Sequence, residues 1–326
     1  MDTQPVVLIM GPTGAGKTDL AIALARRLPV EIVSVDSAMV YRGMDIGTGK
    51  PAPQVLAKFP HRLVDILDPV EAYSAGQFVR DALQAIHDIH ARGRLPLLVG
   101  GTMLYFRALR QGLAELPQAD AAVRADLDAR AAQHGWPALH AELERIDPLA
   151  AARIQPNDGQ RIQRALEVFR LSGRSLSELH AATAPPDPGL SFHAYAWAPS
   201  DRERLYQSIQ TRFASMMQSG FLAEVRRLYE RGNLHARLPA IRSVGYRQLW
   251  AHLEGEVSLD GAIADAILAT RHLARRQFVW LRADREVKWI DALESHASAH
   301  MEREVASLCT QCDRLASVLN EARPRG

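Results

Sequence analysis

The chain has 326 residues, 47% of them apolar, which is enough apolar material for a full hydrophobic core. Its formal net charge of +2 excludes a bulk electrostatic attraction to nucleic acids or membranes. Its 2 cysteines exclude a disulfide scaffold, and no apolar run reaches the roughly 18 residues that would span a bilayer. We therefore expect a globular, cytoplasmic protein with no leader segment and no membrane partner.

A phosphate-binding loop is predicted near the N-terminus. Residues 6–10 form an apolar run typical of a buried strand, and residues 20–25 are typical of a helix. The sequence GPTGAGKT between them fits G-x-x-x-x-G-K-[ST], in which backbone N–H groups cradle an anion, Lys17 adds a charge and Thr18 binds Mg²⁺. The predicted phosphate-binding residues are Gly11, Pro12, Thr13, Gly14, Ala15, Gly16, Lys17 and Thr18.

Two further strand ends are predicted to meet this loop at one edge of a parallel sheet. Strands are expected at 31–35, 61–67 and 95–99, and a helix at 76–91, while the glycines and prolines of 42–60 indicate a long functional loop. Because ligands bind at the carboxyl ends of parallel strands, Gly11, Asp36 and Thr102 mark the candidate site.

The second half of the chain changes character twice. Residues 118–184 are typical of consecutive helices, and 192–197 alternate like a returning strand. Further helices are expected at 201–219, 221–231, 259–282 and 295–321, with a short strand at 287–290. The predicted fold class is α/β, with a P-loop parallel sheet covered by helices on both faces and an all-helical insertion domain. We assign the catalytic core to 1–116 and 190–326, and the insertion to 117–189.

Asp36 is the candidate acid at the sheet edge. P-loop enzymes that use nucleotides commonly hold Mg²⁺ with an aspartate that ends an apolar strand. Here the strand at 95–99 ends in Gly100-Gly101-Thr102 with no acid, and the carboxylate at the sheet edge comes instead from Asp36. It is a candidate general base, and the alternative is an aspartate that caps a helix or turn.

Six motifs occur in a fixed order: GPTGAGKT at 11–18, DSAMVY at 36–41, GGTMLY at 100–105, QRIQR at 160–164, RSVGYR at 242–247 and RQFVW at 276–280. Together they resemble the bacterial tRNA dimethylallyltransferase family, over about residues 6–282. The resemblance implies transfer of a dimethylallyl group from dimethylallyl diphosphate to N6 of the adenine that follows the anticodon. The P-loop would then bind a departing diphosphate, with Mg²⁺ as cofactor.

The resemblance also implies roles for individual residues. Asp36 would accept the proton of N6, Thr102 would contact the substrates near the transfer point, and Arg212 would assist at the diphosphate. The target base would be extruded from the anticodon loop into a channel. The residues expected to contact the anticodon stem-loop are Asp36, Ser37, Ala38, Met39, Thr102, Arg124, Gln160, Arg161, Ile162, Gln163, Arg164, Arg242, Ser243, Val244, Gly245, Tyr246, Arg247, Arg275, Arg276, Gln277, Phe278, Val279, Trp280, Leu281 and Arg282. We expect the protein to act as a monomer.

Three alternatives remain open on the sequence alone. A small-molecule kinase would place ATP at the same loop and use Asp36 as the base of its acceptor. An adenylate dimethylallyltransferase would prenylate free AMP, although a nucleotide needs no long helical insertion. A GTPase-like RNA-binding switch is disfavoured because no N-K-x-D motif is evident.

Four candidate metal ligands lie close together in the sequence near the C-terminus. His296, His300, Cys309 and Cys312 superficially suggest zinc, but their order and spacing do not match a zinc finger. A helix with an apolar stripe that includes Val305 and Cys312 is the favoured interpretation.

Overall fold

The structure is a computed structural model that describes residues 3–114, 116–181 and 187–321, with side chains of the last helix described as far as Cys312. The chain divides into two compact units, one formed by residues 1–109 and 187–326 and the other by residues 110–186. Each unit has its own hydrophobic core, and we describe each by itself.

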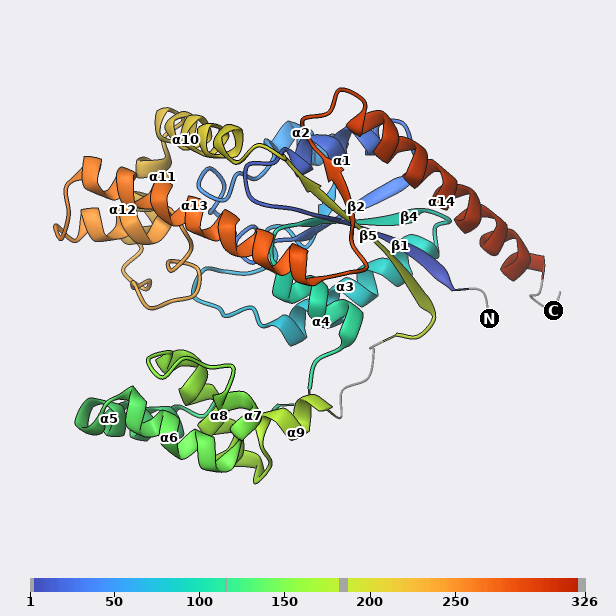
Figure 1. The fold of residues 1–326 in the computed structure, drawn as a ribbon. Helices are drawn as coiled ribbons and strands as arrows, with labels where there is room; N and C mark the ends of the chain where they lie inside the picture. The colour runs from blue at the N-terminus through green and yellow to red at the C-terminus, as the bar shows by residue number, and fades with distance from the viewer. Residues whose placement is uncertain (1–2, 115, 182–186, 322–326) are drawn as a thin grey trace. The chain divides into compact units, whose positions relative to one another are not determined.

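A six-stranded, all-parallel sheet forms the centre of the larger unit (Figure 1). Its strand order is β3-β2-β4-β1-β5-β6. The strands are β1 Gln4–Met10, β2 Val30–Val35, β3 His61–Arg62, β4 Leu95–Gly100, β5 Leu190–Ala198 and β6 Lys288–Asp291. The predicted α/β fold class is confirmed. Burial of both faces explains why the central strands read as continuous apolar runs.

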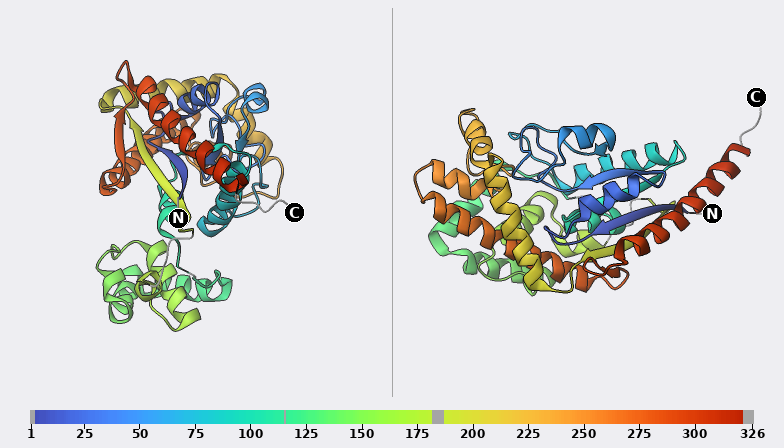
Figure 2. Two further views of the ribbon diagram at one scale, coloured as in Figure 1. Left: turned by 90° about the vertical axis from the view of Figure 1, so that its right-hand side faces the viewer. Right: turned by 90° about the horizontal axis from the view of Figure 1, so that it is seen from above.

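Helices cover the sheet of the larger unit. On one face, α1 and α14 contribute Leu24 and Met301 to a cluster with Val7 and Leu97 of the strands, and Figure 2 shows α14 running alongside the sheet. Helix α3 contacts β2 and β4 and has no residue in that cluster, so it covers the other face. The helices are α1 Lys17–Ala25, α2 Pro53–Lys58, α3 Ala75–His90, α4 Met103–Gln111, α10 Arg202–Gln218, α11 Phe221–Tyr229, α12 Tyr246–Leu253, α13 Leu259–Ala283 and α14 Ala297–Glu321. None of the helices in the described part of the chain is both long and apolar enough to cross a bilayer.

The two cysteines of α14 belong to this core. Cys309 and Cys312 form no disulfide bond and are buried, together with Val305 and Leu308. Within the described residues no group of three or more His, Cys, Asp or Glu side chains could hold a metal ion. The burial of these four side chains confirms the apolar-stripe interpretation of this helix as far as Cys312.

Three local predictions need correction. The strand expected at 61–67 ends at Arg62, because Leu63 and Asp65 adopt φ values of 64° and 57° that no strand accommodates. The loop expected at 42–60 contains the short helix α2. Helix α12 was not predicted, and it starts after Gly245, whose φ of 92° favours glycine.

The smaller unit is entirely helical among its described residues. Its helices are α5 Ala121–His134, α6 Trp136–Ile146, α7 Pro148–Ala151, α8 Gly159–Ser172 and α9 Leu176–Ala181. They pack around a small core that includes Leu127, Leu143 and Ile162. The Glu167 side chain is fully buried in this unit and pairs with Arg124 and Arg164 at 2.8 Å and 2.6 Å. A buried carboxylate is tolerated only with such partners.

Candidate active site

The predicted phosphate-binding loop connects β1 to α1, and three other elements hold its backbone. Trp197 of β5 donates from Nε1 to the Ala15 carbonyl at 2.8 Å, and Ser208 of α10 donates to the Gly14 carbonyl at 3.0 Å. The Oε1 atom of Gln277, on α13, accepts from the Thr13 N–H at 2.9 Å. These three hydrogen bonds fix the backbone conformation of the loop, so the loop is preformed before an anion binds.

Gln277 connects the P-loop to the end of β4. While Oε1 accepts from Thr13, Nε2 donates to the Gly101 carbonyl at 2.8 Å. A Cβ atom on Gly101 would lie 2.3 Å from Nε2, so only glycine permits this approach. The Gln277 side chain, expected to contact tRNA, is instead buried and joins two strand ends of the site.

Lys17 lies at the start of α1 with its ammonium group folded back onto the loop. Its Nζ donates to the Pro12 carbonyl at 2.8 Å. Burial, followed by the charge of Arg212, lowers the pKa of Lys17 to about 7, while the charge of Asp36 opposes this shift. The negative charge of an anion bound in the loop would stabilise the ammonium form of Lys17.

Asp36 and Thr102 meet because β2 and β4 are paired in register, with Val35 opposite Gly100. The Thr102 hydroxyl accepts from the Ser37 N–H at 3.1 Å, across the two strand ends. Asp36 Oδ1 accepts from the N–H groups of Ala38 and Met39 at 2.8 Å and 3.2 Å. Asp36 thus stabilises a turn through one oxygen, and the described residues form no hydrogen bond with its other oxygen.

Arg212 of α10 approaches the same group of charges from the far side of the loop at 41–50. Its Nη2 donates to the Thr48 carbonyl at 3.4 Å, and a Cβ atom on Gly49 would lie 1.9 Å from Nη2. Burial lowers the pKa of Arg212, while the charges of Asp36 and Asp19 oppose the shift. The charge of Asp36 acts on both Lys17 and Arg212, and the charge of Arg212 acts on Lys17, so these three residues form one charged site.

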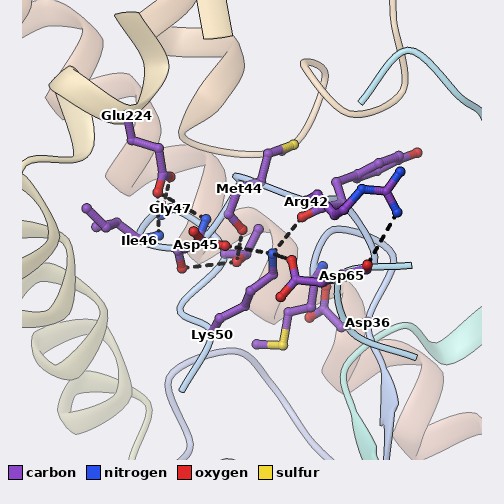
Figure 3. A network of polar contacts seen from close by, with 12 residues as sticks. Asp36, Arg42, Met44, Asp45, Ile46, Gly47, Lys50, Asp65 and Glu224 are labelled. Atoms are coloured by element: carbon purple, nitrogen blue, oxygen red, sulfur yellow. Dashed lines mark hydrogen bonds and ion pairs between the residues drawn. The ribbon is translucent and has the colours of Figure 1, made fainter. Parts of the chain in front are cut away.

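The loop at 41–50 is held by two buried charged side chains, shown in Figure 3. Glu224 of α11 accepts from the N–H groups of Asp45, Ile46 and Gly47 at 3.0, 2.8 and 3.1 Å. It also accepts from the Tyr246 hydroxyl at 2.5 Å, and burial together with this carboxylate raises the pKa of Tyr246. Glu224 thereby fixes the segment that leads to the Thr48 carbonyl and Arg212.

Lys50 anchors the other end of that loop. Its Nζ donates to the Tyr41 carbonyl at 2.6 Å and to the carboxylates of Asp45 and Asp65 at 2.8 Å and 2.5 Å (Figure 3). Neither Glu224 nor Lys50 was singled out from the sequence. Only the amphipathic pattern of α11, which turns Glu224 toward the apolar side with Val225 and Leu228, gives a hint of its burial.

The residues predicted to contact tRNA fall into three groups: a buried one, an exposed one, and a half-buried one made of Asp36, Ala38, Met39, Thr102, Arg124, Gln163, Arg164, Ser243, Val244 and Phe278. The buried group, whose side chains serve the protein interior, comprises Ile162, Gly245, Tyr246, Gln277 and Leu281. Arg124 and Arg164 neutralise the buried Glu167, and Gln163 donates to Asp128 at 2.6 Å. The exposed group comprises Ser37, Gln160, Arg161, Arg242, Arg247, Arg275, Arg276, Val279, Trp280 and Arg282.

The last turns of α13 combine exposed arginines with an exposed ring, Trp280, and a half-buried ring, Phe278. Arg107 lies over the Trp280 ring at 5.8 Å, and Arg282 lies over the Phe278 ring at 5.5 Å. Val279 and Trp280 are 61% and 39% exposed, on a helix whose Gln277 side chain contacts the P-loop. Such a surface suits unstacked bases and phosphates.

The parallel sheet, the preformed phosphate-binding loop and the charged site beside it define a P-loop enzyme that acts on a phosphorylated substrate. Residues 39–284 match the family model described as IPP transferase, and residues 4–65 match the model described as isopentenyl transferase. The chain belongs to the IPP transferase family.

Solved structures agree with this assignment. The chain is 35% identical to the tRNA isopentenylpyrophosphate transferase of Bacillus halodurans, with a TM-score of 0.69, over 97% of this chain and 100% of that one. It is 29% identical to the tRNA Δ(2)-isopentenylpyrophosphate transferase of Staphylococcus epidermidis, with a TM-score of 0.66, over 94% and 99%. A eukaryotic dimethylallyltransferase acting on tRNA is 26% identical, with a TM-score of 0.77, over 93% and 78%.

Proposed function

We propose that the protein transfers the dimethylallyl group of dimethylallyl diphosphate to N6 of the adenine on the 3′ side of the anticodon in tRNA, releasing diphosphate. Membership of the IPP transferase family supports the coarse activity, transfer of an isopentenyl-type group to tRNA. The observation that carries the finer proposal is the charged site of Lys17, Asp36 and Arg212 beside the P-loop. It offers cations for a diphosphate and a carboxylate for a proton.

The cations would stabilise the leaving group. An allylic C–O bond ionises when the negative charge that develops on the diphosphate is stabilised, and the N–H groups of the loop, Lys17 and Arg212 all carry positive charge. The hydroxyl of Thr18 is a suitable Mg²⁺ ligand, and Mg²⁺ would supply further charge to the diphosphate. Since the described residues contain no all-protein metal cluster, this ion would also depend on phosphate oxygens of the donor.

The carboxylate would activate the acceptor. The N6 amine is a weak nucleophile because its lone pair is delocalised into the adenine ring, so removal of its proton during attack lowers the barrier. Asp36 Oδ1 is occupied by two backbone N–H groups, which leaves Oδ2 to take the proton. Thr102, bonded to Ser37, would position the base against this oxygen.

The target adenine can enter this site only after it has left the base stack of the anticodon loop. We therefore propose that the anticodon loop is splayed and the target base flipped out. The exposed cations and aromatic rings of α13 would hold phosphates and neighbouring bases. Of the residues on α8, Gln160 and Arg161 are the exposed candidates. We keep the monomeric state and the cytoplasmic location as predictions.

One experiment separates this function from its alternatives. The protein is incubated with labelled dimethylallyl diphosphate, Mg²⁺, AMP and unmodified tRNA whose anticodon is followed by adenine, in parallel with and without ATP. We expect label on N6 of that adenine without any requirement for ATP. Label on AMP instead of tRNA would favour an adenylate dimethylallyltransferase, and ATP-dependent phosphorylation would favour a kinase.

Donor affinity is expected to depend on pH. Because the pKa of Lys17 is about 7 in the free protein and a bound diphosphate favours the ammonium form, binding takes up a proton above that pH. The affinity should therefore fall by about tenfold per pH unit as pH rises above 7. Calorimetric titration of dimethylallyl diphosphate between pH 7 and pH 9 measures this. A Lys17→Met variant should bind weakly without the pH dependence, and a flat wild-type profile would contradict the assignment.

The tRNA surface of the smaller unit can be tested without damaging its core. Replacing Gln160 and Arg161 with alanine should weaken tRNA binding by about three- to tenfold and leave donor affinity unchanged, because each exposed contact contributes about 1 kcal/mol or less. Arg164 is unsuitable because its loss would leave Glu167 short of a partner. Filter binding of tRNA measures the effect, with the exposed Arg174→Ala as matched control. An equal loss of donor affinity would count against an RNA surface.

A further inference from the structure

A cavity lies at the opposite end of β2 from Asp36. Its volume is about 380 Å³, and Glu31, Lys58, Phe59, His61, Arg62 and Arg94 are among the residues that line it. The cavity borders Ile32, four residues before Asp36, which corresponds to about 13 Å along a strand. The phosphate-binding loop and its charged site do not contribute to this cavity.

Positive charge dominates the walls of this cavity. Lys58, Arg62 and Arg94 face a single lining carboxylate, Glu31. That carboxylate already accepts two hydrogen bonds from Arg92, at 2.9 Å and 2.8 Å, while the Nε atoms of Arg62 and Arg94 lie 3.5 Å and 3.8 Å from it. Arg62 also lies 3.7 Å from the carboxylate of Asp88. The four cations Lys58, Arg62, Arg92 and Arg94 still outnumber the two carboxylates Glu31 and Asp88.

Two buried nitrogen atoms of the lining residues lack a hydrogen-bond partner among the described residues. They are Nε2 of His61 and Nε of Arg94. His61 Nδ1 lies 2.7 Å from the Phe59 carbonyl, so Nδ1 carries a proton and Nε2 is the atom left unpaired. Buried polar atoms in native proteins are nearly always paired, so these two nitrogens are open to a partner from outside the chain.

An aromatic ring adds to the wall. Phe59 lies beneath two cations, the guanidinium of Arg26 at 5.4 Å and the ammonium of Lys58 at 5.7 Å from its centroid. Together with Ala25 and Pro60 it gives the cavity an apolar side beside its basic side. A cavity of this size with convergent polar groups is typical of a small-molecule site.

We propose that this cavity binds a small anion that carries a phosphate group, through Lys58, His61, Arg62 and Arg94. Arginine and lysine supply the charge and the N–H donors that phosphate oxygens prefer. Hydrogenphosphate carries both an O–H donor and charged acceptors, so it completes His61 Nε2 in either protonation state of the ring. This site is separate from the proposed prenyl transfer and does not depend on it.

The test is a calorimetric titration of the full chain with inorganic phosphate. Since the P-loop also binds phosphate, the Lys17→Ala variant serves as the background in which the second site is measured. We expect that background to retain one binding event, and a further Lys58→Ala/Arg62→Ala change to weaken it by about tenfold or more. The exposed Arg303→Ala on α14 is the matched control and should change nothing.

A second measurement reports on the cavity directly. The imidazole resonances of His61, identified by their loss in His61→Asn, should shift when phosphate is added to the Lys17→Ala protein. A titration with AMP distinguishes two sources of the ligand. A higher affinity for AMP than for inorganic phosphate indicates a nucleotide, and equal affinities for the two indicate that the site recognises the phosphate group alone. Absence of phosphate binding in the Lys17→Ala background, or binding that Lys58→Ala/Arg62→Ala leaves intact, would overturn the proposal.

Discussion

Replacing Asp36 with asparagine is expected to lower the rate of prenyl transfer by about 10²- to 10⁴-fold, the usual contribution of a positioned general base. Asparagine keeps an oxygen that accepts from the N–H groups of Ala38 and Met39, so the turn after β2 is preserved. It has no carboxylate to take the N6 proton. Single-turnover kinetics with tRNA and saturating dimethylallyl diphosphate measure the effect on the chemical step.

Donor affinity separates this role from a general loss of charge. Because Asp36 raises the pKa of Lys17, its removal also weakens diphosphate binding at high pH, and affinity is best compared at about pH 6.5. There the Asp36→Asn protein should bind the donor within about threefold of wild type. Asp19→Asn is the matched control, since Asp19 also acts on Arg212. Near wild-type turnover in Asp36→Asn would remove Asp36 from the role of base.

Alanine at Asp36 would have a second effect. It removes the acceptor of two backbone N–H groups, so the turn that carries Ser37 toward Thr102 loses about 1 kcal/mol of stabilisation. A lower melting temperature in Asp36→Ala than in Asp36→Asn, with similar losses of turnover, would assign the turn and the proton to different oxygens of one carboxylate.

The sequence predicts those parts of the fold that depend on residues adjacent in the chain. The apolar run before Gly11 and the helix after Thr18 define the P-loop locally, and the parallel sheet follows from the alternation of such runs with helices. The proximity of Asp36 and Thr102 could also be predicted, because parallel strands place their carboxyl ends at one edge of the sheet.

The features that depend on distant partners could not be predicted. Gln277 reads as a polar residue on a basic helix, yet its amide binds Thr13, 264 residues earlier in the chain. Tyr246 lies in a motif expected to contact RNA, but its ring is fully buried and its hydroxyl serves Glu224. Charge and hydropathy patterns report which face of an element is polar, and they do not reveal which polar group it pairs with.

Replacing Glu224 with alanine is expected to destabilise the larger unit strongly. In Glu224→Ala three backbone N–H groups and the Tyr246 hydroxyl lose their acceptor in a buried position. We expect a loss of about 3–5 kcal/mol in the free energy of unfolding. Urea unfolding followed by tryptophan fluorescence measures this. The exposed Glu230→Ala, just after the same helix, should stay within about 0.5 kcal/mol of wild type.

The same substitution should reach the active site through the loop it fixes. Without Glu224 the segment from Asp45 to Gly47 is no longer held, and Thr48 no longer presents its carbonyl to Arg212. Donor affinity at low temperature, where the variant stays folded, should fall. In Tyr246→Phe the three N–H groups keep their acceptor, so stability should fall by only about 1.5–3 kcal/mol. Its donor affinity should be unchanged. If Glu224→Ala unfolded at the same urea concentration as Glu230→Ala, the carboxylate would not be what holds this loop.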